Sequence, residues 1–274
     1  MSVSVALLQL DVSSAESVDA RVARVLNLIP RAAANAEFLV LPELWHVGAH
    51  DLDSIRTHAQ SINGSLARQL SAAAHAQGVW LHAGSIAERD ATGQLFNTSL
   101  LFAPSGELRA SYRKIHLFGF DSGESSVLTA GTELVQTQTP LGRTGLSTCY
   151  DLRFPELFRA LGAAGVESLV IPAGWPAARI EHWNVLLRAR AIENQCWVLA
   201  CNEVGSQNTA DGSILLGGFS AVIDPLGEVV AQGSAEECVV FASVDVTTVQ
   251  DIRNAFPVLR DIKLTPDFNS EDQT

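Results

Sequence analysis

Basic residues are scarce in this chain of 274 residues. Lys and Arg together number 18 against 30 Asp and Glu, which leaves a formal net charge of −12 at pH 7. Nucleic-acid binding depends on Lys and Arg contacts to phosphate, and the sequence has neither a basic run nor a phosphate-cradling glycine loop. We therefore expect no nucleic-acid partner. An anionic substrate would need locally placed cations, for which Arg153 and Lys114 are candidates.

Long apolar runs are also missing. No run reaches the roughly 18–20 residues that a membrane span requires. Residues 1–9 alternate as a strand and lack the basic start and long apolar centre of a signal peptide. We expect a cytoplasmic protein that has no membrane partner.

Cysteine is rare, and the cysteines are not arranged in closely spaced pairs. The four cysteines show none of the short paired spacings of a disulfide scaffold or a zinc site. His46, His50 and His58 lie near one another, but no two have the spacing of a helical zinc site. We predict neither a metal nor a cofactor, and a reducing cytosol would keep the cysteines as free thiols.

What the chain does have is enough apolar material for a large core. Hydrophobic residues make up 47% of the sequence, which excludes a disordered chain. Helix and strand signals alternate along both halves, and no Pro-, Gly- or Ser-rich linker divides them. We predict one domain over residues 1–261, built from two mixed sheets packed face to face with helices outside, and a polar tail over residues 262–274.

Cys149 lies in a stretch that predicts an exposed nucleophile. Residues 144–148 predict a short strand, the thiol falls in a tight turn, and a helix is predicted from Pro155, where a missing backbone N–H costs nothing. The N-terminus of that helix would favour the Cys149 thiolate. Taken alone, a single cysteine in an apolar segment is more often a small buried core residue.

Two charged residues make the catalytic interpretation stronger. Glu43 follows the apolar run 38–42, and Lys114 ends an alternating segment, so both are predicted at strand ends. Active sites of open α/β sheets collect at strand ends. Together with Cys149 these residues supply a base, a cation and a thiol, which can attack an amide or nitrile carbon and stabilise the developing charge.

Three segments resemble the signature blocks of the nitrilase superfamily of carbon–nitrogen hydrolases. They are LPE at 41–43, YRKIHLF at 112–118 and CYDLRFPEL at 149–157. The segments PAGWP at 172–176 and RARAIENQ at 188–195 are also family-like, and residues 252–261 match the usual ending of the family. The resemblance therefore runs from the first strand to about residue 261.

The resemblance implies a role for each core residue. Glu43 would be the general base, Lys114 the oxyanion stabiliser and Cys149 the nucleophile, in a Glu-Lys-Cys triad. It also implies a fold: a four-layer α-β-β-α sandwich, commonly paired into a homodimer through the helices that flank the sheets.

The family places a second glutamate between the lysine and the cysteine, where it positions the substrate. We assign this role to Glu124, which lies 25 residues before Cys149. The loop that carries it varies among members, so Asp121 and Glu133 remain alternatives.

Four further residues are predicted to bind substrate because of their neighbours in the sequence. Tyr150 and Arg153 follow Cys149, Phe118 follows Lys114, and Trp175 lies in a Gly-Trp-Pro turn after a strand. For Trp175, simple packing is an equally good interpretation.

The block after Cys149 resembles the amidase branches more than the true nitrilases. The resemblance implies an ω-amidase-like enzyme that cleaves a small, carboxylate-bearing amide and releases ammonia through a thioester. N-carbamoyl hydrolases and deaminated-glutathione amidases are close alternatives. A catalytically silent scaffold member and a cysteine acyltransferase also remain open.

Overall fold

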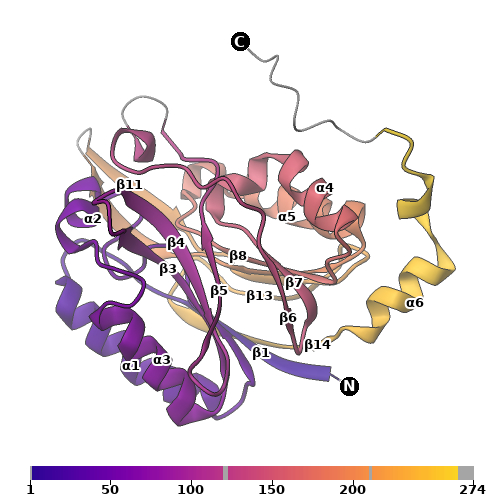
Figure 1. Cartoon of the computed structure of the whole chain (residues 1–274), viewed down its shortest axis with the longest axis horizontal. Helices are drawn as coiled ribbons and strands as arrows, with labels where there is room; N and C mark the ends of the chain where they lie inside the picture. Colours follow the sequence, from indigo (N-terminus) through magenta and orange to yellow (C-terminus); the bar gives the residue numbers. More distant parts are fainter. Residues whose placement is uncertain (1, 120–122, 210–211, 265–274) are drawn as a thin grey trace.

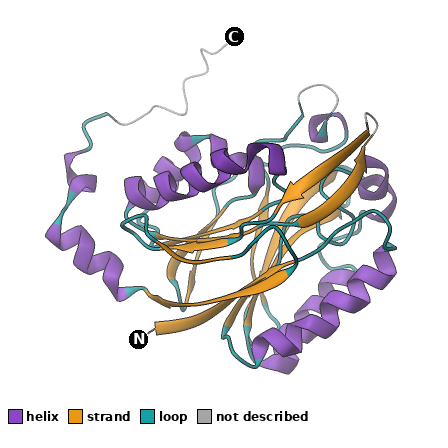
Figure 2. Cartoon of the chain, turned by 180° about the vertical axis from the view of Figure 1, so that it is seen from behind, coloured by secondary structure: helices purple, strands orange, loops and turns teal. Residues whose placement is uncertain are grey.

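Two six-stranded mixed sheets pack face to face, and helices cover the outer face of each (Figures 1 and 2). This computed structural model describes residues 2–119, 123–209 and 212–264. The four-layer α-β-β-α sandwich is thus confirmed. The predicted polar tail lies outside the described residues from residue 265 onward.

Along the chain, the strands of the two sheets alternate with helices. The first sheet has the order β14 (Cys238–Asp245), β1 (Ser2–Gln9), β2 (Phe38–Val40), β3 (Trp80–Arg89), β4 (Leu95–Phe102), β5 (Leu108–Arg113). The second has the order β13 (Val229–Gln232), β12 (Ala221–Ile223), β9 (Trp197–Cys201), β8 (Ser168–Pro172), β7 (Gly142–Leu146), β6 (Gln136–Thr139). A separate two-stranded ribbon pairs β10 (Val204–Thr209) with β11 (Gly212–Gly217).

The helices form the outer layers. The long helices α1 (Val18–Ala33) and α3 (Ser65–Gln77) pack on the first sheet, while α4 (Pro155–Ala163) and α5 (Ile180–Asn194) pack on the second. The short α2 (Leu52–His58) lies near the ribbon, and α6 (Thr247–Ala255) leads away from the sandwich (Figure 1). None of these helices is long and apolar enough to cross a membrane.

The sequence of β1 shows why the sheet is buried on both faces. Side chains on a strand alternate between faces, and here both sets are apolar. Val5 and Leu7 join the core that contains the second sheet, whereas Ala6 and Leu8 join the core under α1 and α3. The strand therefore serves both cores of the sandwich.

Helix α1 begins after the cap residue Ser17. Ser13 and Glu16 have the spacing of a capping box, but Ser17 is the cap: its side chain accepts a hydrogen bond from the backbone N–H of Ala20. Glu16 instead pairs with arginines of the helix, among them Arg24 at 2.8 Å.

Parallel strands bring the functional loops to one edge. Strand β2 runs parallel to β1 and β3, and β8 runs parallel to β7 and β9. The carboxyl ends of such strands meet at the same edge of a sheet. Glu43 after β2 and Cys149 after β7 therefore face each other across the two sheets.

His82 gives this fold a pH dependence that can be measured. Its ring on β3 is fully buried, burial lowers the pKa of His82 to about 3, and neither ring nitrogen has a hydrogen-bond partner among the described residues. In the unfolded chain the pKa is about 6.5. The depressed folded pKa therefore stabilises the protein above pH 6.5, and this stability is lost as the pH falls toward 3.

We expect wild type to lose stability relative to His82→Leu by about 1.4 kcal/mol per pH unit below about pH 6. Urea unfolding of both proteins at pH 7 and pH 5 measures the difference. The exposed His75 on α3 provides the control, because His75→Leu removes a histidine that lies at the protein surface. A difference between wild type and His82→Leu that stays constant with pH would contradict the buried neutral ring.

Candidate active site

Cys149 lies at a strained turn after β7. Its φ of +47° is unusual for a residue with a side chain, and such strain concentrates at functional sites. The turn continues as a short 3₁₀ helix over Cys149–Arg153, and α4 begins only at Pro155. The sequence thus predicted the elbow, but a full 3₁₀ turn separates the thiol from the helix.

Asp151 holds this turn in place. Its buried carboxylate accepts hydrogen bonds from the backbone N–H of Thr148 at 2.9 Å and from the Tyr112 hydroxyl at 2.7 Å. It also accepts from the backbone N–H of His116 at 2.9 Å and from His116 Nδ1 at 2.7 Å. Asp151 therefore ties the cysteine turn to the loop that follows β5, which carries Lys114.

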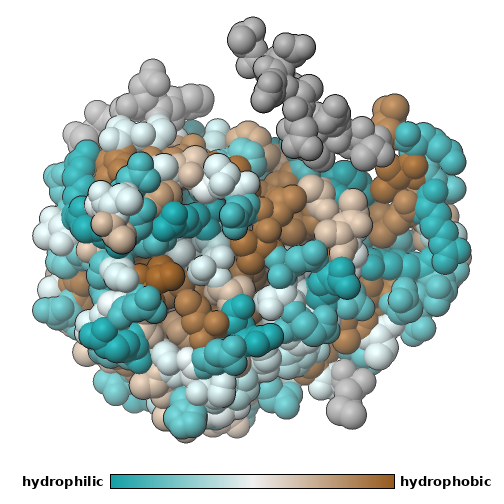
Figure 3. Space-filling model, viewed as in Figure 1, coloured by the Kyte–Doolittle hydropathy of each residue, from teal (hydrophilic) through white to brown (hydrophobic). Residues whose placement is uncertain are grey.

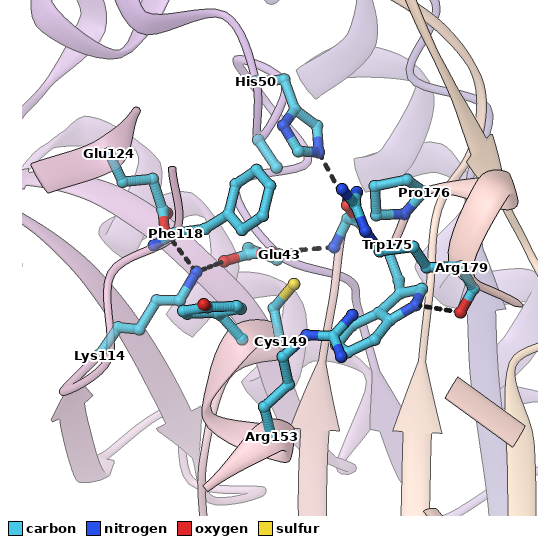
Figure 4. Close-up of a pocket in the computed structure, with 13 residues that line it drawn as sticks. Glu43, His50, Lys114, Phe118, Glu124, Cys149, Arg153, Trp175, Pro176 and Arg179 are labelled. Carbon is cyan, nitrogen blue, oxygen red and sulfur yellow. Dashed lines mark hydrogen bonds and ion pairs between the residues drawn. The ribbon is translucent and has the colours of Figure 1, made fainter. Parts of the chain in front are cut away.

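Lys114 bridges two buried carboxylates. Its Nζ lies 2.7 Å from Glu43 Oε1 and 2.6 Å from Glu124 Oε2, and all three side chains are at least 95% buried (Figure 4). Glu43 Oε2 also accepts a hydrogen bond from the Gly174 N–H at 2.9 Å, and Glu124 Oε2 accepts one from the Phe118 N–H at 2.8 Å. One ammonium thus faces two anchored acids.

The structure distinguishes Glu124 from one alternative for the second glutamate. Glu124 contacts Lys114 directly, whereas Glu133 is exposed on the wall of a different cavity. Asp121, the other alternative, lies outside the described residues.

The surroundings of the two acids in the cluster shift their pKa values in opposite directions. Burial would raise the pKa of Glu43, but the charge and hydrogen bond of Lys114, the Cys149 thiol and the Gly174 N–H outweigh burial and lower it. Burial and the Glu43 charge together keep the pKa of Glu124 raised despite Lys114. Pairs of acids with pKa values pushed apart are typical of acid–base sites.

The cysteine rests as a thiol. Burial and the neighbouring Glu43 carboxylate raise the pKa of Cys149 well above its usual value, and Lys114 offsets them only in part. The expectation that a helix N-terminus favours a resting thiolate was therefore wrong. The sulfur must pass its proton to a base, and Glu43 accepts a hydrogen bond from it.

A pocket with about 370 Å³ of empty space opens onto these residues. The four residues predicted to bind substrate all line it: Phe118, Tyr150, Arg153 and Trp175. The rings of Phe118 and Tyr150 meet edge to face at 5.3 Å, and the Arg153 guanidinium lies 4.6 Å from the centre of the Trp175 ring. The pocket is small, aromatic and cationic at one side.

The sequence interpretation missed two polar or charged side chains of the pocket wall, those of His50 and Arg179. His50 donates from Nε2 to the Gly174 carbonyl at 2.9 Å, and the backbone carbonyl of Arg179 accepts from Trp175 Nε1 at 2.8 Å. Their positions in the sequence gave a weak signal that they lie near the pocket. His50 follows Glu43 by seven residues, and Arg179 follows Trp175 by four.

Gly174 has to be a glycine because two elements approach its Cα closely. A Cβ there would lie 2.6 Å from Ala49 Cβ and 2.8 Å from Glu203 Oε2. Sequence reasoning also missed Glu203. Burial and the Glu43 charge raise its pKa well above the usual value, so a neutral acid lies behind Glu43.

Over the described part of the chain, no three His, Cys, Asp or Glu side chains are grouped so that they hold a metal ion. The chemistry available at the pocket is that of a thiol, a carboxylate base and an ammonium.

Comparisons with known proteins agree with this chemistry. The family model described as carbon-nitrogen hydrolase matches residues 4–254. A 2-oxoglutaramate amidase from Paenarthrobacter nicotinovorans is 43% identical over 264 residues, covering 94% of this chain and 88% of that relative. Omega-amidase NIT2 from Homo sapiens is 35% identical over 271 residues, covering 94% of each. The crystal structure of Saccharomyces cerevisiae Nit3, from branch 10 of the nitrilase superfamily, matches with a TM-score of 0.83 and 30% identity, covering 94% of this chain and 95% of that one.

Proposed function

The chain belongs to the carbon–nitrogen hydrolase family, and from this membership we propose that it is a thiol amidase acting on a small ω-amide with a carboxylate at its other end. An amide of a 2-oxo acid, such as 2-oxoglutaramate, has this form. The observation that carries the proposal is the pair of guanidinium groups, Arg153 and Arg179, in the same pocket as Cys149.

The acylation step assigns one task to each core residue. Glu43 takes the proton of the Cys149 thiol, and the sulfur attacks the amide carbon. Two of the three Lys114 N–H groups donate to carboxylates, so the third remains for the oxyanion, together with the backbone N–H of Tyr150. Glu43 then gives its proton to the leaving nitrogen, which departs as ammonia and leaves a thioester on Cys149.

The same residues serve the second step. Glu43 takes a proton from water, and the resulting hydroxide attacks the thioester carbonyl while Lys114 again holds the oxyanion. Collapse of the intermediate returns the proton to the sulfur and releases the carboxylic acid. Glu124 anchors Lys114 in both steps through the 2.6 Å contact.

Two cations in the wall of the pocket support a carboxylate on the substrate. Within the described ranges, neither Arg153 nor Arg179 forms an ion pair with an acidic residue; Arg153 contacts His182 Nδ1 at 3.3 Å and the Trp175 ring instead. Burial and the nearby Arg179 charge lower the pKa of Arg153. A substrate carboxylate would relieve this repulsion, and guanidinium–carboxylate pairs are strong and directional.

We expect Arg153→Gln and Arg179→Gln each to lower kcat/KM for 2-oxoglutaramate by roughly 10- to 100-fold, the effect of losing one hydrogen bond to a charged group. A neutral amide such as propionamide should lose less than about threefold, because it makes no such contact. Ammonia release measures both.

The exposed Arg109 on β5 gives the matched control, and Arg109→Gln should leave both substrates unaffected. Equal losses for charged and neutral amides in the Arg153 and Arg179 variants would contradict the carboxylate site. Absence of ammonia release by wild type from ω-amides, carbamoyl amines and nitriles would favour a scaffold role.

Exposed apolar side chains support a homodimer. Val185 and Ile192 on α5 are 63% and 49% exposed, and the Ile192 side chain lies against Gly227 of the turn between β12 and β13. Apolar residues are also exposed on the segment after α6, including Leu264 at 87% (Figure 3). We place the partner subunit on these surfaces.

We also propose that residues 1–261 form a single catalytic domain and that the protein works in the cytoplasm.

A further inference from the structure

Asn97 is a buried amide that contacts both acids of the cluster. It lies on β4 with no solvent exposure, and its Nδ2 is 2.8 Å from Glu43 Oε1 and 3.1 Å from Glu124 Oε1. Each of the two amide hydrogens therefore donates to a different carboxylate. Neither the family blocks in the sequence nor the catalytic steps above assign this residue a role.

The contacts close a ring of four groups. Lys114 Nζ bridges Glu43 and Glu124 from one side, at 2.7 and 2.6 Å, and Asn97 Nδ2 bridges them from the other. The backbone strengthens the ring, because the Lys114 N–H donates to the Asn97 carbonyl at 2.9 Å. Asn97 thus fixes both the side chains and the strand end that carries the lysine.

An amide is well suited to this position. Two carboxylates share one ammonium, so one negative charge is left over in a buried space, where like charges repel strongly. An uncharged donor satisfies one oxygen of each acid without adding charge, and hydrogen bonds to carboxylates are stronger than neutral ones. Leucine has a similar volume but no donor, and aspartate has the same shape but adds a third negative charge.

We propose that Asn97 is a positioning residue that holds the Glu43 carboxylate on the Cys149 thiol and the Glu124 carboxylate on Lys114. This inference rests on the proposed roles of Glu43 and Cys149. It extends them, because the geometry makes Glu43, which follows β2, depend on a residue of β4, on the other side of β3 in the sheet.

The ionisation of Glu43 depends on every titratable group that faces it. These groups are Lys114 after β5, Glu124 in the following loop, Cys149 after β7 and, behind Gly174, Glu203 after β9. Asn97→Leu leaves all of them in place and removes one donor to the ionised form of Glu43. Loss of that donor favours the protonated form, so Glu43 should require a higher pH to act as a base.

The test follows alkylation of Cys149 by iodoacetamide across pH, read by mass spectrometry, because this reaction needs the base but no natural substrate. We expect Asn97→Leu to slow alkylation at pH 7 by about tenfold and to move the acid limb of the profile up by about one pH unit. The acid limb of kcat/KM for ammonia release should move in the same direction.

Asn194→Leu is the matched control, since Asn194 is equally buried but bonds to the Arg190 carbonyl on α5, away from the pocket. Its rates and its acid limb should stay within twofold and 0.2 pH units of wild type, values on the order of experimental error. Asn97→Asp, which keeps the shape of the side chain, should move the limb upward as Asn97→Leu does, and it carries the test if the leucine variant does not fold.

A folded Asn97 variant whose alkylation rate and acid limb match wild type would overturn the proposal. Wild-type Cys149 that alkylates with a clear acid limb but releases no ammonia from any amide would instead count against the proposed function alone. The two failures are therefore distinguishable.

Discussion

Cys149→Ala is expected to reduce ammonia release by at least about 10⁴-fold, the scale of losing a catalytic nucleophile. Among the described residues of the pocket, no other group can replace the sulfur, because Lys114 is held by two carboxylates and Glu43 is the proposed base. The fold should persist, since the change removes one sulfur atom from a turn that Asp151 holds by four hydrogen bonds. Thermal unfolding and a coupled ammonia assay measure the two effects.

The chain supplies a matched control in Cys196, which is fully buried between α5 and β9 and whose burial raises its pKa to about 12. Cys196→Ala should keep full activity and react with iodoacetamide at Cys149 as wild type does. Residual turnover in Cys149→Ala above one part in about 10³ would exclude the thioester route.

Lys114→Met should have the second large effect, a loss of at least about 10³-fold in kcat. The variant loses an oxyanion donor and the cation that keeps Glu43 ionised. Two buried carboxylates would then face each other, so one must take up a proton and the base is lost. Breaking a buried ion pair by removing one partner also costs about 3–5 kcal/mol of stability, which urea unfolding would show.

A double variant separates these two consequences. In Lys114→Met/Glu124→Gln one positive and one negative charge are removed together, so the buried charge of the cluster returns to that of wild type. We expect its stability to recover by more than half and its activity to remain at the level of Lys114→Met. Recovery of activity in the double variant would argue that Lys114 acts only as a structural counter-ion.

The positions of the functional residues follow from signals that a single sequence carries. Glu43, Lys114 and Cys149 each come directly after a predicted strand, and parallel strands bring such ends together. Strands β8 (Ser168–Pro172) and β9 (Trp197–Cys201) carry a similar signal, because each is a short apolar run between turn signals.

Other features depend on packing that the sequence does not encode locally. Asn97 is the third residue of β4, and only the antiparallel register of β4 and β5 brings it beside Lys114. Arg179 reaches the pocket because the chain turns after Trp175 into a 3₁₀ helix. Neither contact has a sequence spacing by which to recognise it.

The protonation state of Cys149 is a further property that the local sequence does not predict. A strand-to-helix elbow favours a thiolate when the helix begins at the cysteine. Here the 3₁₀ turn intervenes, and burial beside Glu43 raises the pKa of the thiol instead. The place of Cys149 at a turn after a strand was thus available from the sequence, but its protonation state required the distances between the side chains.

The most direct test of the account is the mass of the protein during turnover. We would mix wild type with 2-oxoglutaramate, quench with acid within the first turnovers, and measure the intact mass and the Cys149 peptide. The account predicts an acyl adduct equal to the amide minus ammonia, confined to Cys149 and missing in Cys149→Ala. Rapid ammonia release without an adduct on Cys149, or with the adduct on another residue, would contradict it.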